Sequence, residues 1–464
     1  MASSATSQAT FTTVDPASGE VLARYALHDD AQIEAALARA QAAFERQRRA
    51  RLSERTALLR RLATRLREAK TVLATLASHE MGKPIAESEA EVEKCAWCCE
   101  LTADAANAWL ADEVVATDAQ RSYVAFRPLG PILAIMPWNF PYWQVFRAAV
   151  PALAAGNTLV LKHAPNVCGT ALAIERTFLE AGAESGVLGA LFIEPERVAG
   201  IIADHRVAGV TLTGSTRAGG AVAALAGGHL KKSVLELGGS DPFVVLADAD
   251  LAAAVATAIR ARFQNAGQSC IAAKRFIVER SRYDEFVERF VAAARALRVG
   301  DPLDRATQIG PLARADLRDN LARQLAASRA SGARLLLGGE PLARPGFFFA
   351  PTVLVSVPSD APALCEETFG PLATIVPARD ADHALALANA TEYGLGASLW
   401  TRDLERAEAF AARIESGAVF VNAMTASDPR IPFGGIKRSG HGRELGILGI
   451  REFTNAQTVS IAQS

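Results

Sequence analysis

Residues 131–163 read PILAIMPWNFPYWQVFRAAVPALAAGNTLVLKH, and this stretch decides the fold class. Two short apolar runs, Ile132–Met136 and Thr158–Lys162, flank a segment with a helical pattern. Strands that alternate with helices of this length form βαβ units, in which successive strands are parallel. The stretch therefore predicts a parallel sheet covered by helices.

The same alternation extends along most of the chain. The first set of expected strands continues with Val187–Ile193, Val207–Thr213 and Val234–Leu237. A second set comprises residues 242–246, Arg275–Glu279, Ala333–Leu337, Leu372–Val376, Ala397–Thr401 and Ala418–Asn422. Two sets of this size predict two doubly wound α/β domains with a cleft between them.

The remaining segments have other patterns. Residues 11–25 are typical of a hairpin, and helices are expected after caps at Asp29 or Asp30 and at Ser53. A longer helix is expected over residues 87–109; its three cysteines are expected to be buried by packing rather than to bind a metal. Two strand-like segments, 114–127 and 452–461, belong to neither alternation, and we expect them to pack on another element or on another subunit.

Composition excludes several classes of protein. The chain has 464 residues, with 49 Lys plus Arg against 50 Asp plus Glu, so no global charge attracts nucleic acid. Six cysteines are too few for a secreted disulfide scaffold, and none forms a spaced CxxC pair typical of zinc. Residues 1–14 lack the charge and apolar pattern of a targeting peptide, and no apolar run has the roughly 18 residues of a membrane span. We expect a cytoplasmic protein with no nucleic-acid, membrane or metal partner.

Three polar positions could carry chemistry. Cys270 ends the polar segment NAGQSC, a place better suited to exposing a thiol than to packing it. Glu236 lies at the end of an expected strand, where it is either a general base or simply a solvated or ion-paired carboxylate. Asn139, in PWNFP, is a candidate hydrogen-bond donor to an oxyanion. These side chains alone would suit either hydrolysis or oxidation.

A cofactor would decide between those reactions. Residues 213–220, TGSTRAGG, open a helix directly after a strand, so backbone N–H groups are available for a pyrophosphate. The segment is neither a GxGxxG nor a Walker motif, which makes it a weak signal by itself. Lys162, at a strand end, could supply a cation to the nucleotide. The glycine-rich segment 432–440 has no chemical role that its composition alone would indicate.

Taken together, these segments resemble the aldehyde dehydrogenase superfamily. Six motifs occur in the family's order: PWNFP from 137, TGST from 213, ELGG from 236, GQSC from 267, EETFGP from 366 and PFGGIKRSGHGRE from 432. The resemblance implies two Rossmann-like domains and a small β oligomerisation element. The expected boundaries are 1–112 and 128–237 for the dinucleotide-binding domain, 238–445 for the catalytic domain, and 113–127 and 446–464 for the oligomerisation element. A homodimer or homotetramer is expected.

The resemblance also assigns roles. It implies that Cys270 is the nucleophile, Glu236 the base and Asn139 the oxyanion donor. The implied cofactor contacts are Gly214 and Ser215 with the pyrophosphate, Lys162 and Glu367 with the riboses, Trp138 and Phe369 with the nicotinamide, and Leu237 beside them. Strictly NAD-dependent members often have a Glu three residues after the strand-end lysine, where this chain has Pro165. Without that carboxylate a 2′-phosphate is not repelled, so use of both NAD and NADP is expected.

Within the superfamily the chain most resembles the succinate-semialdehyde dehydrogenases. Arg147 matches an arginine that binds the distal carboxylate of the substrate in those enzymes, and Ser427 matches a serine of the same site. A second arginine found there is replaced by Gln264, so another short acidic aldehyde such as glutarate semialdehyde stays open. Two rival functions also stay open: a cofactor-independent thiol esterase and a non-catalytic protein of the same fold.

Overall fold

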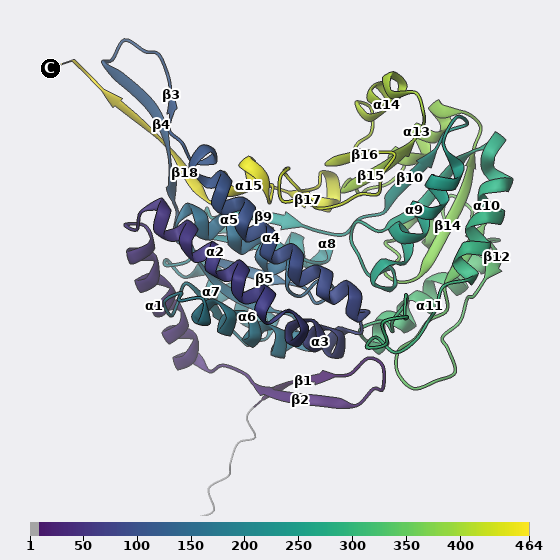
Figure 1. The fold of residues 1–464 in the computed structure, drawn as a ribbon, viewed down its shortest axis with the longest axis horizontal. Coiled ribbons are helices and arrows are strands. Elements are labelled where there is room, and N and C mark those ends of the chain that lie inside the picture. Colours follow the sequence, from purple (N-terminus) through teal and green to yellow (C-terminus); the bar gives the residue numbers. More distant parts are fainter. Residues whose placement is uncertain (1–8, 464) are drawn as a thin grey trace, which may run out of the picture.

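The computed structural model describes residues 9–463 and contains two α/β lobes side by side (Figure 1). The first lobe is built on a six-stranded sheet in the order β17-β9-β8-β5-β6-β7. Its strands are β5 Pro131–Met136, β6 Thr158–His163, β7 Leu188–Ala190, β8 Gly209–Thr213, β9 Lys232–Glu236 and β17 Gly440–His441. All pairs are parallel except β17 with β9. The expected α/β class with parallel sheets is confirmed.

Helices cover both faces of this sheet. Ile132, Ala134 and Met136 of β5 pack into one core with helices α4 and α5, and Leu133 packs into another with α1 and α8. Because side chains of a strand alternate between faces, both faces must be covered, which explains why the strand is apolar throughout. The helices of this lobe are α1 Asp30–Gln47, α2 Leu52–Glu68, α3 Lys70–Met81, α4 Ile85–Trp109, α5 Trp143–Ala155, α6 Cys168–Glu180, α7 Val198–Ala203 and α8 Thr216–Gly228.

The second lobe contains a seven-stranded sheet in the order β12-β13-β14-β11-β10-β15-β16. Its strands are β10 Asp241–Val245, β11 Ala273–Glu279, β12 Arg334–Leu337, β13 Thr352–Val355, β14 Leu372–Ala378, β15 Gly396–Trp400 and β16 Ala418–Val421. Its helices are α9 Leu251–Phe263, α10 Arg280–Arg295, α11 Ala315–Ala330, α12 Pro362–Cys365, α13 Ala381–Asn389 and α14 Leu404–Ala411. The sequence did not predict β13, and β12 pairs with it antiparallel at the edge of an otherwise parallel sheet.

The N-terminal predictions are confirmed with one exception. β1 Thr10–Val14 and β2 Val21–Ala26 form the expected hairpin, and Asp29 caps α1. Ser53 is not a cap, because α2 already begins at Leu52 and contains it. The Glu54 carboxylate accepts a hydrogen bond from the N–H of Arg51 at 2.8 Å, which stabilises that earlier start. Cys95, Cys98 and Cys99 on α4 are fully buried in the core, as expected.

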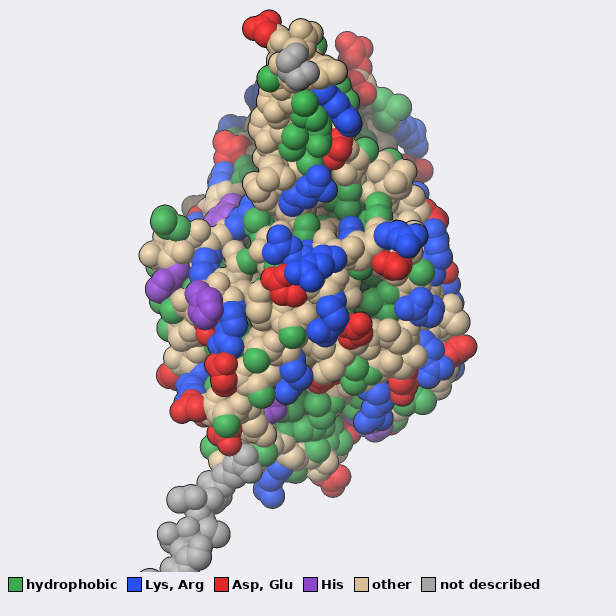
Figure 2. Space-filling model, turned by 90° about the vertical axis from the view of Figure 1, so that its left-hand side faces the viewer, with side chains coloured by type: hydrophobic (Ala, Val, Ile, Leu, Met, Phe, Trp, Pro, Cys, Tyr) green, Lys and Arg blue, Asp and Glu red, His purple; other side chains and the backbone are tan. Residues whose placement is uncertain are grey.

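A three-stranded antiparallel sheet projects from the first lobe as an arm (Figure 1). It consists of β3 Glu113–Val114, β4 Arg121–Pro128 and β18 Thr454–Ile461, which follows α15 Gly446–Glu452. The two strand-like segments outside the alternations therefore pair with each other. Figure 2 shows the arm at the top with hydrophobic side chains on its surface, and Val114, Val115 and Ile461 are exposed there. Among residues 9–463, no helix has both the length and the apolar character to cross a membrane.

Candidate active site

A cavity of about 330 Å³ lies where the two lobes meet. Helices α4 and α5 form one wall, and the segments 264–272 and 424–427 contribute others. Of the residues singled out in the sequence, Cys270, Arg147, Ser427 and Gln264 line this cavity. Glu236 and Asn139 do not line it but are buried beside it, close enough for Glu236 to influence the Cys270 thiol electrostatically. The predicted catalytic and substrate residues thus converge, although they come from distant parts of the chain.

The loop that carries Cys270 is tightly fixed. It follows α9, and its short 3-10 turn Gln264–Gly267 places Asn265 and Ala266 at φ values of 51° and 52°. Such left-handed backbone is costly for residues other than glycine and persists only where the surroundings enforce it. Here the Asn265 amide donates to the Asn139 carbonyl oxygen at 2.7 Å, and the Asn265 N–H donates to Glu87 Oε2 at 2.8 Å. The loop therefore presents the thiol in one defined position.

The Cys270 thiol is partly buried in the cavity wall. Burial raises its pKa to about 11, and the nearby positive charges of Arg147 and Lys274 oppose this effect. In the free protein the sulfur is consequently a protonated thiol at neutral pH. It becomes a nucleophile only when its proton is removed or when a further positive charge enters the site.

Asn139 is buried against the same loop. Its Nδ2 donates a hydrogen bond to the carbonyl oxygen of Gln268 at 3.0 Å, two residues before the thiol. A carboxamide has a second N–H, for which the described residues provide no acceptor. Asn139 can therefore donate a hydrogen bond to a ligand bound next to Cys270.

Glu236 is a buried carboxyl group without a partner. Its side chain lies at the end of β9, and neither oxygen has a hydrogen bond among the described residues. Burial raises its pKa well above the ordinary value; the charge of Glu444 adds to this, and the charges of Arg147 and Arg443 oppose it. A solvated surface carboxylate is thereby excluded, and a carboxyl group with a raised pKa is, once ionised, a stronger base than an ordinary one.

Arg147 has a partner that the sequence did not indicate. Its guanidinium is buried and forms an ion pair with the buried carboxylate of Glu444. It also donates to Thr213 Oγ1 at 3.2 Å and lies 4.6 Å from the centroid of the Phe433 ring. The charge of Arg147 is thus already balanced within the protein.

The expected cofactor residues lie around the ends of the first sheet's strands. Ser215 caps α8, and its Oγ accepts a hydrogen bond from the Ala218 N–H at 3.2 Å. The neighbouring Gly214 N–H donates to the backbone oxygen of Glu236 at 3.0 Å. Leu237 packs so closely on Gly219 that a Cβ at that glycine would collide with it. The turn expected to bind phosphate is therefore directly attached to the strand end that carries Glu236.

The other cofactor candidates are equally well placed. Lys162 is mostly buried, which lowers its pKa, and no described residue forms a hydrogen bond or ion pair with it. Glu367 accepts a hydrogen bond from the Gly239 N–H at 3.0 Å. The rings of Trp138 and Phe369 meet edge to face, 5.7 Å between centroids. An unpartnered buried cation and a helix N-terminus fit a dinucleotide phosphate.

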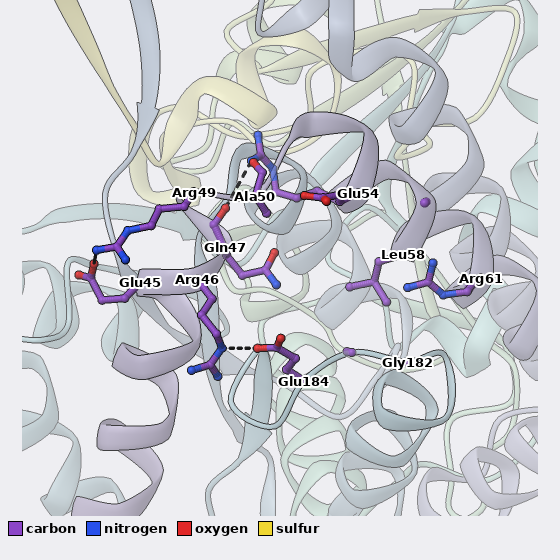
Figure 3. A pocket seen from close by; sticks show the side chains of 13 residues that line it. Glu45, Arg46, Gln47, Arg49, Ala50, Glu54, Leu58, Arg61, Gly182 and Glu184 are labelled. Carbon is purple, nitrogen blue, oxygen red and sulfur yellow. Dashed lines mark hydrogen bonds and ion pairs between the residues drawn. The ribbon is translucent and has the colours of Figure 1, made fainter.

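A larger hollow elsewhere has none of these features. It measures about 710 Å³ and lies between α1, α2 and the segment 182–184 (Figure 3). Its arginines already have partners: Arg46 pairs with Glu184, and Arg49 lies 3.7 Å from Glu45. No predicted site residue lines it, so size alone does not mark the active site. Within residues 9–463, no group of three or more His, Cys, Asp or Glu is placed to hold a metal ion.

Sequence reasoning missed three charged groups that shape the site: the partly buried Lys94 and the buried Lys274 and Glu444. Lys94 lines the cavity, and Lys274 donates to the carbonyl oxygen of Cys270 at 2.7 Å. Lys274 follows Cys270 by four residues and, with Arg275, interrupts a strand that is buried almost throughout, which was a usable signal. Glu444 is the last residue of the PFGGIKRSGHGRE motif, but no feature of the surrounding sequence indicates its ion pair with Arg147.

Several known proteins are similar to this chain over nearly its full length. The family model described as aldehyde dehydrogenase family matches residues 3–459. A probable NADP(+) succinate-semialdehyde dehydrogenase from Synechocystis is 50% identical over 97% of this chain and 99% of its own length. The NAD(P)+ succinate semialdehyde dehydrogenase Sad from Escherichia coli is 50% identical over 96% of each chain. The crystal structure of a succinic semialdehyde dehydrogenase from Streptococcus pyogenes with NADP+ is similar at TM-score 0.96 and 38% identity, covering 98% of this chain and 100% of that one.

Proposed function

Because this chain belongs to the aldehyde dehydrogenase family, we propose that it oxidises succinate semialdehyde to succinate with NAD or NADP as hydride acceptor. The observation that carries the proposal is the buried, unpartnered carboxyl of Glu236 beside the thiol of Cys270. A thiol with a general base and an oxyanion donor suits covalent oxidation of a carbonyl compound. The two relatives at 50% identity support the choice of aldehyde.

The chain's own residues perform the covalent steps. Cys270 Sγ, once deprotonated, attacks the aldehyde carbon, and Asn139 Nδ2 with the Cys270 N–H stabilises the resulting oxyanion. The bound dinucleotide supplies the hydride acceptor. When the C–H electron pair leaves the carbon, the C–O double bond forms again and Cys270 carries a thioester.

Glu236 completes the reaction. Its carboxylate takes a proton from a water molecule, whose oxygen attacks the thioester carbon. The C–S bond then breaks, which releases succinate and frees the Cys270 thiolate. Water supplies the added oxygen atom, and the two electrons of the C–H bond would pass to the nicotinamide of a bound nucleotide.

The residues proposed to hold the cofactor surround the ends of the first sheet. Gly214 and Ser215 would bind the pyrophosphate at the N-terminus of α8, and Lys162 and Glu367 would bind the riboses. Trp138, Phe369 and Leu237 would form the nicotinamide site. The edge-to-face contact of the first two rings and the packing of Leu237 on Gly219 support this. Pro165, which supplies no carboxylate after β6, supports use of both nucleotides.

The roles that we propose for the domains follow the boundaries expected from the sequence. Residues 1–112 and 128–237 would bind the dinucleotide, and 238–445 would carry the catalytic loop. β17 lies within that second segment but pairs with β9 of the first sheet, so the chain returns to the first lobe before residue 445. Residues 113–127 and 446–464 would join subunits of a homodimer or homotetramer through the arm, whose Val114 and Ile461 are exposed. Six unpaired cysteines support a reducing location such as the cytoplasm.

A panel of aldehydes assayed with NAD and with NADP tests this function. Reduced nicotinamide should appear fastest with succinate semialdehyde, and Cys270→Ala should abolish its formation while the circular dichroism spectrum is unchanged. Glutarate semialdehyde belongs in the panel, because Gln264 at the cavity departs from the arginine expected there. A thiol esterase would instead cleave an ester at a rate that added nucleotide does not change.

A further inference from the structure

Three side chains from separate elements meet at one polar spot in the cavity wall. Lys94, on α4, donates from Nζ to Ser427 Oγ at 3.0 Å. Trp143, on α5, donates from Nε1 to the same oxygen at 2.8 Å, and its ring lies under the ammonium with 4.1 Å from Nζ to the centroid. All three residues line the cavity that contains Cys270. The spot is therefore built by tertiary packing rather than by one flexible surface chain.

Lys94 is a cation whose charge the protein does not balance. Arg147, the other cation nearby, forms an ion pair with Glu444. No carboxylate of residues 9–463 lies within ion-pairing distance of Lys94. Asp428 is near enough to raise the pKa of Lys94, but it forms its ion pair with Arg430, at 2.5 Å. A partly buried ammonium without a counterion is unfavourable until an anion enters beside it.

Ser427 can donate a hydrogen bond to the same anion. Its oxygen already accepts hydrogen bonds from Lys94 and Trp143. A hydroxyl has one O–H to donate, and the described residues offer no acceptor for it. An ammonium and a free O–H side by side are complementary to a carboxylate group.

We propose that Lys94 Nζ and Ser427 Oγ receive the distal carboxylate of the substrate, so that Lys94 determines the preference for a short aldehyde with a terminal carboxylate. This inference rests on the proposed function and adds Lys94 to the substrate cation expected from the sequence, Arg147, which is paired with Glu444 and also acts on Glu236. Gln264 lines the same cavity without charge. Arg260 and Lys94 line it without a carboxylate partner among the described residues, and of the two it is Lys94 that contacts Ser427.

The test compares Lys94→Met, which removes the charge and keeps an apolar chain over Trp143, with Lys94→Arg, which keeps a charge. Steady-state kinetics are measured with succinate semialdehyde and with butanal, which has the same number of carbons and no carboxylate. In Lys94→Met, KM for succinate semialdehyde should rise about 10- to 100-fold, the range for a lost hydrogen bond to a charged group. kcat/KM for butanal should not fall, and Lys94→Arg should retain most of the preference.

A pH profile gives a second readout. Burial and the charge of Arg147 lower the pKa of Lys94 to about 8. The other groups facing it are Asp428, from the loop of Ser427, and Cys95 and Cys98 on its own helix, whose raised pKa values keep them protonated at pH 8. Above about pH 8, KM for succinate semialdehyde should rise relative to KM for butanal, by about tenfold per pH unit. In Lys94→Arg the ratio should stay flat.

The outcomes distinguish a failure of the Lys94 proposal from a failure of the proposed function. If the wild-type protein shows no preference for succinate semialdehyde over butanal, the proposed function fails first. If the wild type has the preference and Lys94→Met keeps it, Lys94 is not the anion-binding group. If Lys94→Met loses activity toward both aldehydes, the pH profile of Lys94→Arg decides, and a profile identical to the wild type overturns the proposal.

Discussion

The ammonium of Lys274 donates a hydrogen bond to the backbone carbonyl oxygen of Cys270, with 2.7 Å between Nζ and O. The same Nζ lies 3.0 Å from the carbonyl oxygen of Ser269 and 3.4 Å from Glu367 Oε1. Lys274 is almost completely buried. One cation therefore fixes the loop of the proposed nucleophile and connects it to a carboxylate that we propose contacts the cofactor.

Replacing Lys274 by Met should impair Cys270 specifically. The change removes hydrogen bonds to two backbone carbonyls and a positive charge that lowers the thiol pKa. We expect kcat to fall by about tenfold or more, since a lost hydrogen bond from a charged group costs about 1.5–3 kcal/mol. Lys231→Met is the matched control, because Lys231 also donates to a backbone carbonyl, that of Asp204, away from the cavity. Equal losses in both variants would contradict a role for Lys274 at the site.

The thiol of Cys270 should react slowly in the free enzyme at neutral pH. Its pKa of about 11 means that the thiolate fraction rises by about tenfold per pH unit below that value. We expect the rate of alkylation by iodoacetamide to increase continuously between pH 7 and about 10. Peptide mass spectrometry must identify the modified residue, because Cys365 is exposed and can also react. A plateau below about pH 9 would mean that the thiol is activated without cofactor.

Removing Arg147 alone should destabilise the protein. Arg147→Met leaves the buried carboxylate of Glu444 without its counterion, which typically costs about 3–5 kcal/mol of unfolding free energy. The double variant Arg147→Met with Glu444→Met should recover most of that loss, because no unpaired charge stays buried. Urea unfolding followed by fluorescence measures both. Stability of the single variant equal to that of the wild type would show that the pair contributes little.

Pro165 should influence the choice of nucleotide. It is the first residue of the short 3-10 helix after β6, close to Lys162 in the chain. A glutamate there would place a negative charge where we propose that the 2′-phosphate of NADP binds. Pro165→Glu should raise KM for NADP about tenfold relative to KM for NAD, whereas Pro165→Gln, similar in size and uncharged, should change the ratio much less. An unchanged ratio in Pro165→Glu would place the 2′-phosphate elsewhere.

Local patterns predicted most of the fold. The apolar runs at β5 and β6 marked strands buried on both faces, and the Asp29 side chain marked the start of α1. β13 was missed because its four residues follow β12 without an intervening helix, so the alternation of strands and helices gave no place for it. The side chain of Ser53 is of the type that caps a helix, whereas the Glu54 carboxylate acts two residues before Ser53, on the N–H of Arg51.

The site was predictable where a residue's role depends on its own loop. The polar segment before Cys270 and the strand end at Glu236 were visible without coordinates. The pairing of Arg147 with Glu444 joins distant segments, and no local pattern reports it. Lys94 is one charge among several on a long helix; only tertiary packing turns it toward the cavity.

Mass spectrometry of the Glu236→Gln variant tests the central claim most directly. The amide cannot take a proton from water, so after incubation with succinate semialdehyde and NADP the enzyme should accumulate a succinyl thioester on the Cys270 peptide. The same variant without nucleotide should carry no thioester. Rapid turnover by the variant, or a succinyl group that forms on Cys270 without nucleotide, would contradict an oxidation in which this carboxyl releases the product from this sulfur.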